Sequence, residues 1–129
     1  MAWTIPGFTF TRVAGEDLSS SQYYYVKLST TDTVIVCAGA TDVPIGILQN
    51  APASGAEATI MVTGISKVNS NAALSIGDLI GTSGDGQADA KVPGTDTTEY
   101  VVGVVLESSS AAGALATATV NCLNPHRAA

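Results

Sequence analysis

Residues that could do catalytic chemistry are scarce in this sequence. The single histidine, His126, lies in the C-terminal segment Asn124–Ala129, and any Ser–His or Cys–His nucleophile pair would have to use it. Catalysis needs side chains held in a fixed geometry, whereas terminal segments tend to move. We therefore expect His126 to be an exposed terminal residue and the protein not to be an enzyme.

Two further patterns suggest ligand chemistry, but neither has the spacing that the chemistry requires. The glycine-rich segment Gly81–Gly86 lacks the Lys-Ser/Thr pair of a phosphate-binding loop and is flanked by predicted strands. Asp78, Asp85 and Asp89 do not follow the ligand order of a calcium-binding loop. One histidine and two distant cysteines also make a zinc site improbable. The sequence therefore predicts no cofactor and no metal.

The two cysteines, Cys37 and Cys122, lie in apolar surroundings far apart in the sequence. The N-terminus has no basic region followed by an apolar stretch, so it does not resemble a secretion signal. Disulfides persist mainly in oxidising compartments, and buried thiols behave as small apolar groups. Two separate buried thiols are therefore the favoured prediction, and a disulfide stays open as the alternative.

The aromatic residues are few and unevenly placed. The only tryptophan and both phenylalanines, Trp3, Phe8 and Phe10, fall within the first ten residues together with Ile5. A free terminus is normally frayed and polar. We therefore predict that residues 1–12 form an extended arm that docks on another chain through these four side chains. The alternative is that the arm packs on the core of its own domain.

Three consecutive tyrosines, Tyr23, Tyr24 and Tyr25, are the other aromatic feature. On a strand, Tyr23 and Tyr25 would share one face and Tyr24 would lie on the other. Tyrosine combines an apolar ring with a polar hydroxyl, which suits protein interfaces and also stacking on sugars. The run is therefore a candidate interface, with ordinary half-buried sheet residues as the alternative.

Composition and charge exclude several classes of protein. The formal net charge is −6, and the 5 basic residues form no cluster, which argues against nucleic-acid binding. A hydrophobic fraction of 46% argues against disorder. No apolar run approaches the roughly 20 residues of a membrane-spanning helix. We expect a protein that binds neither nucleic acid nor membrane.

The chain reads as all-β. Short segments rich in Val, Ile, Thr and Tyr recur between Gly, Pro, Asn, Asp and Ser, which predicts a small barrel or sandwich. The expected strands are 8–13, 22–28, 34–38, 45–49, 58–62, 66–68, 78–82, 87–91, 100–107 and 114–123. These strands define a barrel-like domain over residues 13–123, between the arm at 1–12 and a tail at 124–129.

Two segments look alike and predict a repeated hairpin. Residues 44–48, a loop and residues 55–62 match residues 102–106, a loop and residues 113–120. Gly46 and Gly103 occupy the same place in the two copies, and the second loop is one residue longer. We expect two hairpins placed similarly in one barrel, with chance similarity of Ala/Gly/Thr-rich strands as the alternative. A glycine within a strand also indicates a bulge or a close backbone approach.

From about Val13 to Cys122, a series of phrases resembles the head decoration (capsid cement) proteins of tailed bacteriophages. The phrases are QYYYVKL at 22–28, VIVCA at 34–38, VPIGILQNAP at 43–52, ATIMVTGISKV at 58–68, IGDLI at 76–80, DG at 85–86 and YVVGVVLE at 100–107. The first twelve residues and the tail match no family phrase. The resemblance implies a β-rich domain on the outside of an icosahedral head, without catalytic residues.

The same resemblance implies partners and a location. Such proteins commonly form homotrimers that bridge neighbouring subunits of the major capsid protein after the shell expands, and they resist the pressure of packaged DNA. The protein would act on the outer surface of the virion, after assembly in the host cytoplasm. Trp3, Ile5, Phe8 and Phe10 would then be the capsid contacts. The competing hypothesis is a carbohydrate-binding β module that uses Tyr23–Tyr25 on a virion or cell surface.

Overall fold

The computed structural model describes residues 2–129, and this part of the chain contains strands but no helix. It therefore holds no helix long and apolar enough to span a membrane. The all-β prediction is confirmed. The strands are β1 (Ile5–Pro6), β2 (Thr9–Ala14), β3 (Tyr25–Leu28), β4 (Thr33–Val36), β5 (Gly46–Leu48), β6 (Glu57–Met61), β7 (Thr63–Asn69), β8 (Leu79–Thr82), β9 (Ala88–Ala90), β10 (Tyr100–Val101), β11 (Gly103–Glu107), β12 (Leu115–Asn121) and β13 (His126–Arg127).

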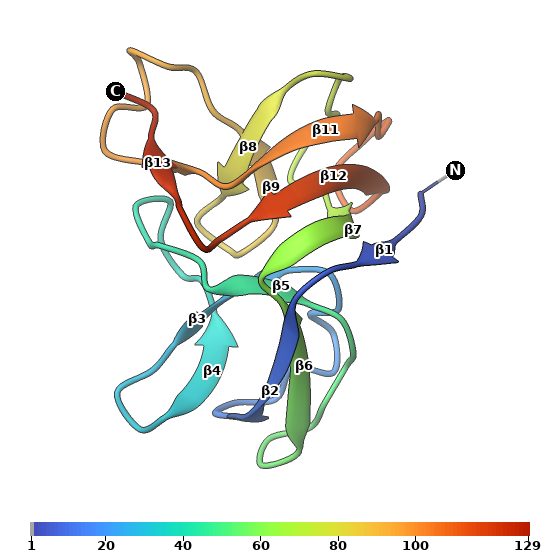
Figure 1. Ribbon diagram of the computed structural model, residues 1–129, viewed down its shortest axis with the longest axis vertical. Helices are drawn as coiled ribbons and strands as arrows, with labels where there is room; N and C mark the ends of the chain where they lie inside the picture. Colours follow the sequence, from blue (N-terminus) through green and yellow to red (C-terminus); the bar gives the residue numbers. More distant parts are fainter. Residues whose placement is uncertain (1) are drawn as a thin grey trace.

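The strands form a small closed barrel and a larger open sheet. The barrel has the order β2-β4-β3-β5-β6, and the six-stranded sheet has the order β1-β7-β12-β11-β8-β9. A third pair, β10-β13, joins the C-terminal segment to the chain. Only Val62 separates β6 from β7, so the chain passes directly from the barrel into the sheet. Figure 1 shows the barrel strands below, the sheet strands above and β5 between them.

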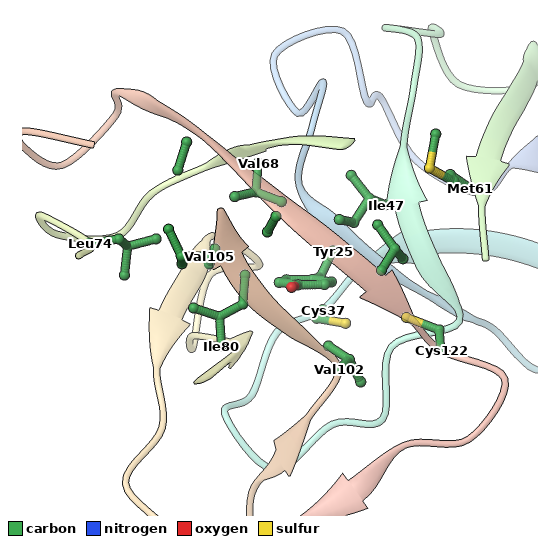
Figure 2. Close-up of a cluster of buried hydrophobic side chains, with 14 of the residues drawn as sticks. Tyr25, Cys37, Ile47, Met61, Val68, Leu74, Ile80, Val102, Val105 and Cys122 are labelled. Atoms are coloured by element: carbon green, nitrogen blue, oxygen red, sulfur yellow. The ribbon is translucent and has the colours of Figure 1, made fainter. Parts of the chain in front are cut away.

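Two apolar cores explain how the barrel and the sheet hold together. The smaller core fills the barrel and includes Val26, Leu48 and Ile60. The larger core includes their sequence neighbours Tyr25, Ile47 and Met61, which pack with sheet residues such as those in Figure 2. Successive side chains of a strand point to opposite faces. Strands β3, β5 and β6 are therefore buried on both faces, which is why they are apolar at consecutive positions.

The two similar segments do form hairpins, but in different sheets. β5 pairs antiparallel with β6 in the barrel, and β11 pairs antiparallel with β12 in the six-stranded sheet. A Cβ atom on Gly46 would lie 2.4 Å from the carbonyl oxygen of Met61, and one on Gly103 would lie 2.2 Å from that of Thr119. Both glycines thus allow the partner strand to approach. The prediction of similar hairpins is confirmed, whereas their placement in one barrel is wrong.

Short strands at the two ends of the chain were not predicted. β1 adds to the edge of β7, and β13 pairs with β10 beside the buried Ala128. The boundary expected between residues 12 and 13 falls inside β2, and the segment 124–129 contains β13. Only residues 2–8 therefore precede the barrel. Pairs of two residues leave no alternating pattern in the sequence, so their contacts appear only in three dimensions.

One lysine is buried where the sheet meets the loop between β9 and β10. The Lys91 side chain is fully buried, and its Nζ atom donates a hydrogen bond to the carbonyl oxygen of Thr82 at 2.8 Å. Nζ also forms an ion pair with Glu99 and lies 3.6 Å from Oδ2 of Asp89. The Ala128 amide donates to the carbonyl oxygen of Glu99. Lys91 therefore connects β8, this loop and the C-terminal segment.

Candidate partner-binding surface

The N-terminal segment lies on the six-stranded sheet of its own chain. Ile5 pairs with Ile65 of β7, and the Lys67 amide donates to Oγ1 of Thr4 at 3.3 Å. Trp3 reaches further across the sheet. Its backbone amide donates to Oγ1 of Thr117 at 2.9 Å, and its Nε1 atom donates to Oε2 of Glu107 at 2.7 Å. Residues 3–6 are therefore held across β7, β12 and β11 by specific contacts.

The chain then crosses from the sheet to the barrel at Gly7 and Phe8. A Cβ atom on Gly7 would lie 2.4 Å from the carbonyl oxygen of Thr63, so only glycine fits here without displacing β7. The carbonyl oxygen of Phe8 accepts a hydrogen bond from the Val62 amide at 2.8 Å. This contact fixes the backbone of Phe8, while 69% of the residue remains exposed. The crossing thus presents an aromatic ring to solvent on a constrained backbone.

The four predicted contact residues separate into two groups. Trp3, Ile5 and Phe8 are exposed, at 38%, 55% and 69% of their surface. Phe10 instead is half-buried and packs against both cores. The structure therefore leaves three of these side chains available to a partner and gives Phe10 a structural role. Capsid binding by the exposed three remains a prediction.

The exposed N-terminal residues continue into one face of the sheet. Ile5 is opposite Ile65 on β7, Ile65 is opposite Thr119 on β12, and the Val104 amide donates to Oγ1 of Thr119. Val104 is in turn opposite Leu79 on β8. Every residue of this row is half-buried or exposed, and none is charged. We call the row Ile5, Ile65, Thr119, Val104 and Leu79 the outer apolar row.

The tyrosine run does not form a joint surface. Tyr25 is 1% exposed and lies in the larger core, where burial raises the pKa of its hydroxyl well above the usual value. Tyr23 has a φ of 68°, which breaks the strand alternation that would place it on the face of Tyr25. Its ring lies 5.6 Å from Nζ of Lys67 and packs against the same core. Tyr25 as an interface residue is therefore wrong, and Tyr23 and Tyr24 are half-buried.

The cysteines are free and buried, as predicted. Figure 2 shows both side chains in the larger core near Tyr25 and Val102. Burial raises the pKa of each thiol to about 12, so both remain protonated at neutral pH. Because the thiolate is the reactive form, neither cysteine is suited to nucleophilic chemistry. His126 is exposed on β13, and no group of three His, Cys, Asp or Glu side chains within residues 2–129 could hold a metal ion.

This burial predicts slow thiol labelling. At pH 8 the native protein should react with neither Cys37 nor Cys122 within an hour when a disulfide reagent is added, and both should react in guanidinium chloride. Absorbance of the released thiolate measures the reaction. A Ser110→Cys variant supplies an exposed thiol as the control, since Ser110 is exposed. Stoichiometric labelling of the native wild type would contradict the buried positions.

Comparison with known proteins places the fold. No protein-family model matches the chain, and no curated protein matches its sequence. Among solved structures, the chain is similar to the head fiber gp8.5 N base of bacteriophage phi29, with a TM-score of 0.67 and 20% sequence identity. The match covers 89% of this chain and 94% of the other. The two chains share a fold. At this identity the similarity establishes the fold and not the function.

Proposed function

We propose that this chain is a structural virion protein that binds the outer surface of an expanded phage head and cements neighbouring subunits of the major capsid protein. The observation that carries the proposal is the fold shared, over 89% of the chain, with a base domain of a phage head fiber. The decoration-protein phrases between Val13 and Cys122 support it from the sequence. This role requires binding and mechanical support and no catalysis.

The exposed apolar residues give the proposal a contact surface. Trp3, Ile5 and Phe8 lie beside or within the outer apolar row, and large aromatic side chains commonly dominate binding energy at protein interfaces. A net charge of −6 suits the outside of a shell better than its DNA-filled interior. We also propose a homotrimer, in which several weak contacts act together through their high effective concentration.

The function can be tested with purified components. The protein should co-sediment with expanded empty heads of the phage that encodes it and raise the temperature at which those heads disrupt. Unexpanded shells serve as the matched control and should bind less protein. Absence of binding to expanded heads would contradict the proposal. Binding to a glycan array instead, lost in Tyr24→Ala, would favour the carbohydrate-binding alternative, although Tyr25 is now excluded from such a site.

A further inference from the structure

The barrel has an incomplete wall beside β2. β2 pairs with β6 along Thr9–Val13, but it pairs with β4 only at Val13 and Ala14. The Phe8 carbonyl accepts from Val62, and the Ala14 amide donates to Ala56. Hydrogen-bonded positions alternate along an antiparallel pair. The even-numbered residues of β2 therefore bond to β6, and the N–H and C=O groups of Thr9 and Thr11 point to the opposite side.

That opposite side is where β4 would continue if it were longer. The Gly15 amide donates to the carbonyl oxygen of Val34, so the odd-numbered positions do face β4. β4 begins only at Thr33, and its register places it beside the end of β2. Thr9 and Thr11 are both exposed. Their backbone groups therefore form an unpaired strand edge within the part of the chain that the structure describes, and we call it the open β2 edge.

The position of Arg12 marks the same opening. Arg12 has the same parity along β2 as Phe10 and Ala14, which pack into the cores. Arg12 nevertheless is exposed, and its guanidinium lies 5.7 Å from the centre of the Phe10 ring. A charged side chain is tolerated at such a position only where it reaches water. The barrel wall is therefore open at the level of Thr11 and Arg12.

A depression of about 250 Å³ accompanies the open β2 edge. Its lining residues are Thr11, Arg12, Val13, Asp32 and Glu57. The two carboxylates outnumber the guanidinium, which is also occupied with the Phe10 ring. Val13 contributes an apolar surface, with 45% of the residue exposed. The depression thus offers backbone donors and acceptors, a small apolar patch and excess negative charge in one place.

We propose that an extended, basic segment of the capsid shell adds to the open β2 edge as a further strand. The proposal rests on the proposed function for the identity of the partner and on the strand edge for the mode of binding. Strand addition uses main-chain hydrogen bonds for affinity, while neighbouring side chains select the sequence. A Lys or Arg of the added segment reaches Asp32 and Glu57, and the N–H and C=O groups of Thr9 and Thr11 pair with its backbone. This contact is separate from the outer apolar row.

A proline variant tests the backbone part of the proposal. Thr11→Pro removes an amide that the barrel ladder does not use, and proline is tolerated at strand edges. We expect Thr11→Pro to lower the affinity for expanded heads at least tenfold. Thr11→Val keeps the amide and loses only the hydroxyl, so it should bind like wild type. Circular dichroism and the Tm establish folding. If Thr11→Pro does not fold, Thr9→Pro provides the same test.

A charge variant tests the side-chain part. Asp32→Asn with Glu57→Gln should weaken head binding at low salt and flatten its dependence on salt concentration, because it removes the carboxylates that face the basic segment. Asn tolerates the left-handed backbone of residue 32, whose φ is 61°. Asp85→Asn, in the turn between β8 and β9, is the matched control and should bind like wild type.

The outcomes separate this proposal from the proposed function. If wild type and Thr11→Pro bind expanded heads equally, the open β2 edge is not the contact and the proposal is overturned, while the proposed function stands. If wild type does not bind heads at all, both fail. If the protein dimerises alone and Thr11→Pro abolishes the dimer, a second copy occupies the edge and the proposal is overturned. Loss of head binding in Thr11→Pro with retention in Thr11→Val supports it.

Discussion

Replacing Lys91 with methionine is expected to destabilise the protein by about 3 kcal/mol, the lower end of the range for breaking a buried ion pair. Methionine fills a similar volume but cannot donate a hydrogen bond. The change leaves Glu99 without its cation and the Thr82 carbonyl without its side-chain donor. The Glu99 side chain is 21% exposed, so water compensates it in part, which is why the lower end applies. Thermal unfolding should show a Tm lowered by roughly 10 °C.

Two further variants identify the cause of that loss. Lys91→Met combined with Glu99→Gln should recover much of the stability, because no uncompensated carboxylate remains. Lys67→Met removes a half-buried lysine near the Tyr23 ring and should change stability by no more than about 1 kcal/mol. A Lys91→Met variant as stable as wild type would contradict the structural role of the ion pair.

The loss should also have a local signature. The loop between β9 and β10 holds the C-terminal segment, since the Gly94 amide donates to the carbonyl oxygen of Ala128 and the Ala128 amide donates to Glu99. Freed of Lys91, this region should exchange its amide hydrogens faster than the barrel does. Hydrogen exchange at Ala128 compared with Val26 in the barrel core measures the difference.

The sequence was informative about strands and weak about what they pack against. β-propensity and the glycine-containing turns located most strands to within a few residues, and the turn at Gly86 has the positive φ of 87° that Asp85-Gly86 suggests. Assignment to the barrel or to the sheet depends on contacts between distant residues. Both hairpins carry the same local signal, so their separation into two sheets could not be read from it.

Burial of single polar residues was also hidden. Lys91 and Tyr25 belong to residue types that are usually at least partly exposed, and nothing in their immediate sequence indicates a buried position. Tyr23 escaped prediction because its left-handed φ interrupts the alternation. The candidate contact residues were found more readily, since Trp3, Ile5 and Phe8 stand out by type in a terminal segment. The open β2 edge could be found only from the register of β2 with β4 and β6.

Removal of residues 2–6 is expected to reduce head binding about 100-fold without unfolding the protein. The deletion removes Trp3 and Ile5, and two aromatic or aliphatic anchors together contribute about 3 kcal/mol to an interface of this kind. It keeps Gly7 and Phe8, whose carbonyl accepts from Val62, and it leaves β2 intact. The pairs lost within the chain are those of β1 with β7 and of Trp3 with Thr117 and Glu107, all near the surface. The Tm should therefore fall by only a few degrees.

Extending the deletion to residue 10 should have a different effect. It removes Thr9 and Phe10, hence the start of β2 and the side chain that packs against both cores. This variant should fail to fold cooperatively, so it cannot report on binding. The deletion of residues 2–6 is the informative truncation because it ends before the barrel begins.

Point variants then assign the binding energy to individual side chains. Trp3→Ala and Phe8→Ala should each weaken binding to expanded heads by roughly tenfold or more, whereas Ile76→Ala, at a residue 71% exposed in the connection between β7 and β8, should have no effect. Quantitative co-sedimentation measures all three. Normal occupancy by the protein lacking residues 2–6 would show that the exposed aromatic residues do not contact the shell. Head binding would then have to come from the open β2 edge alone, which Thr11→Pro tests in the same assay.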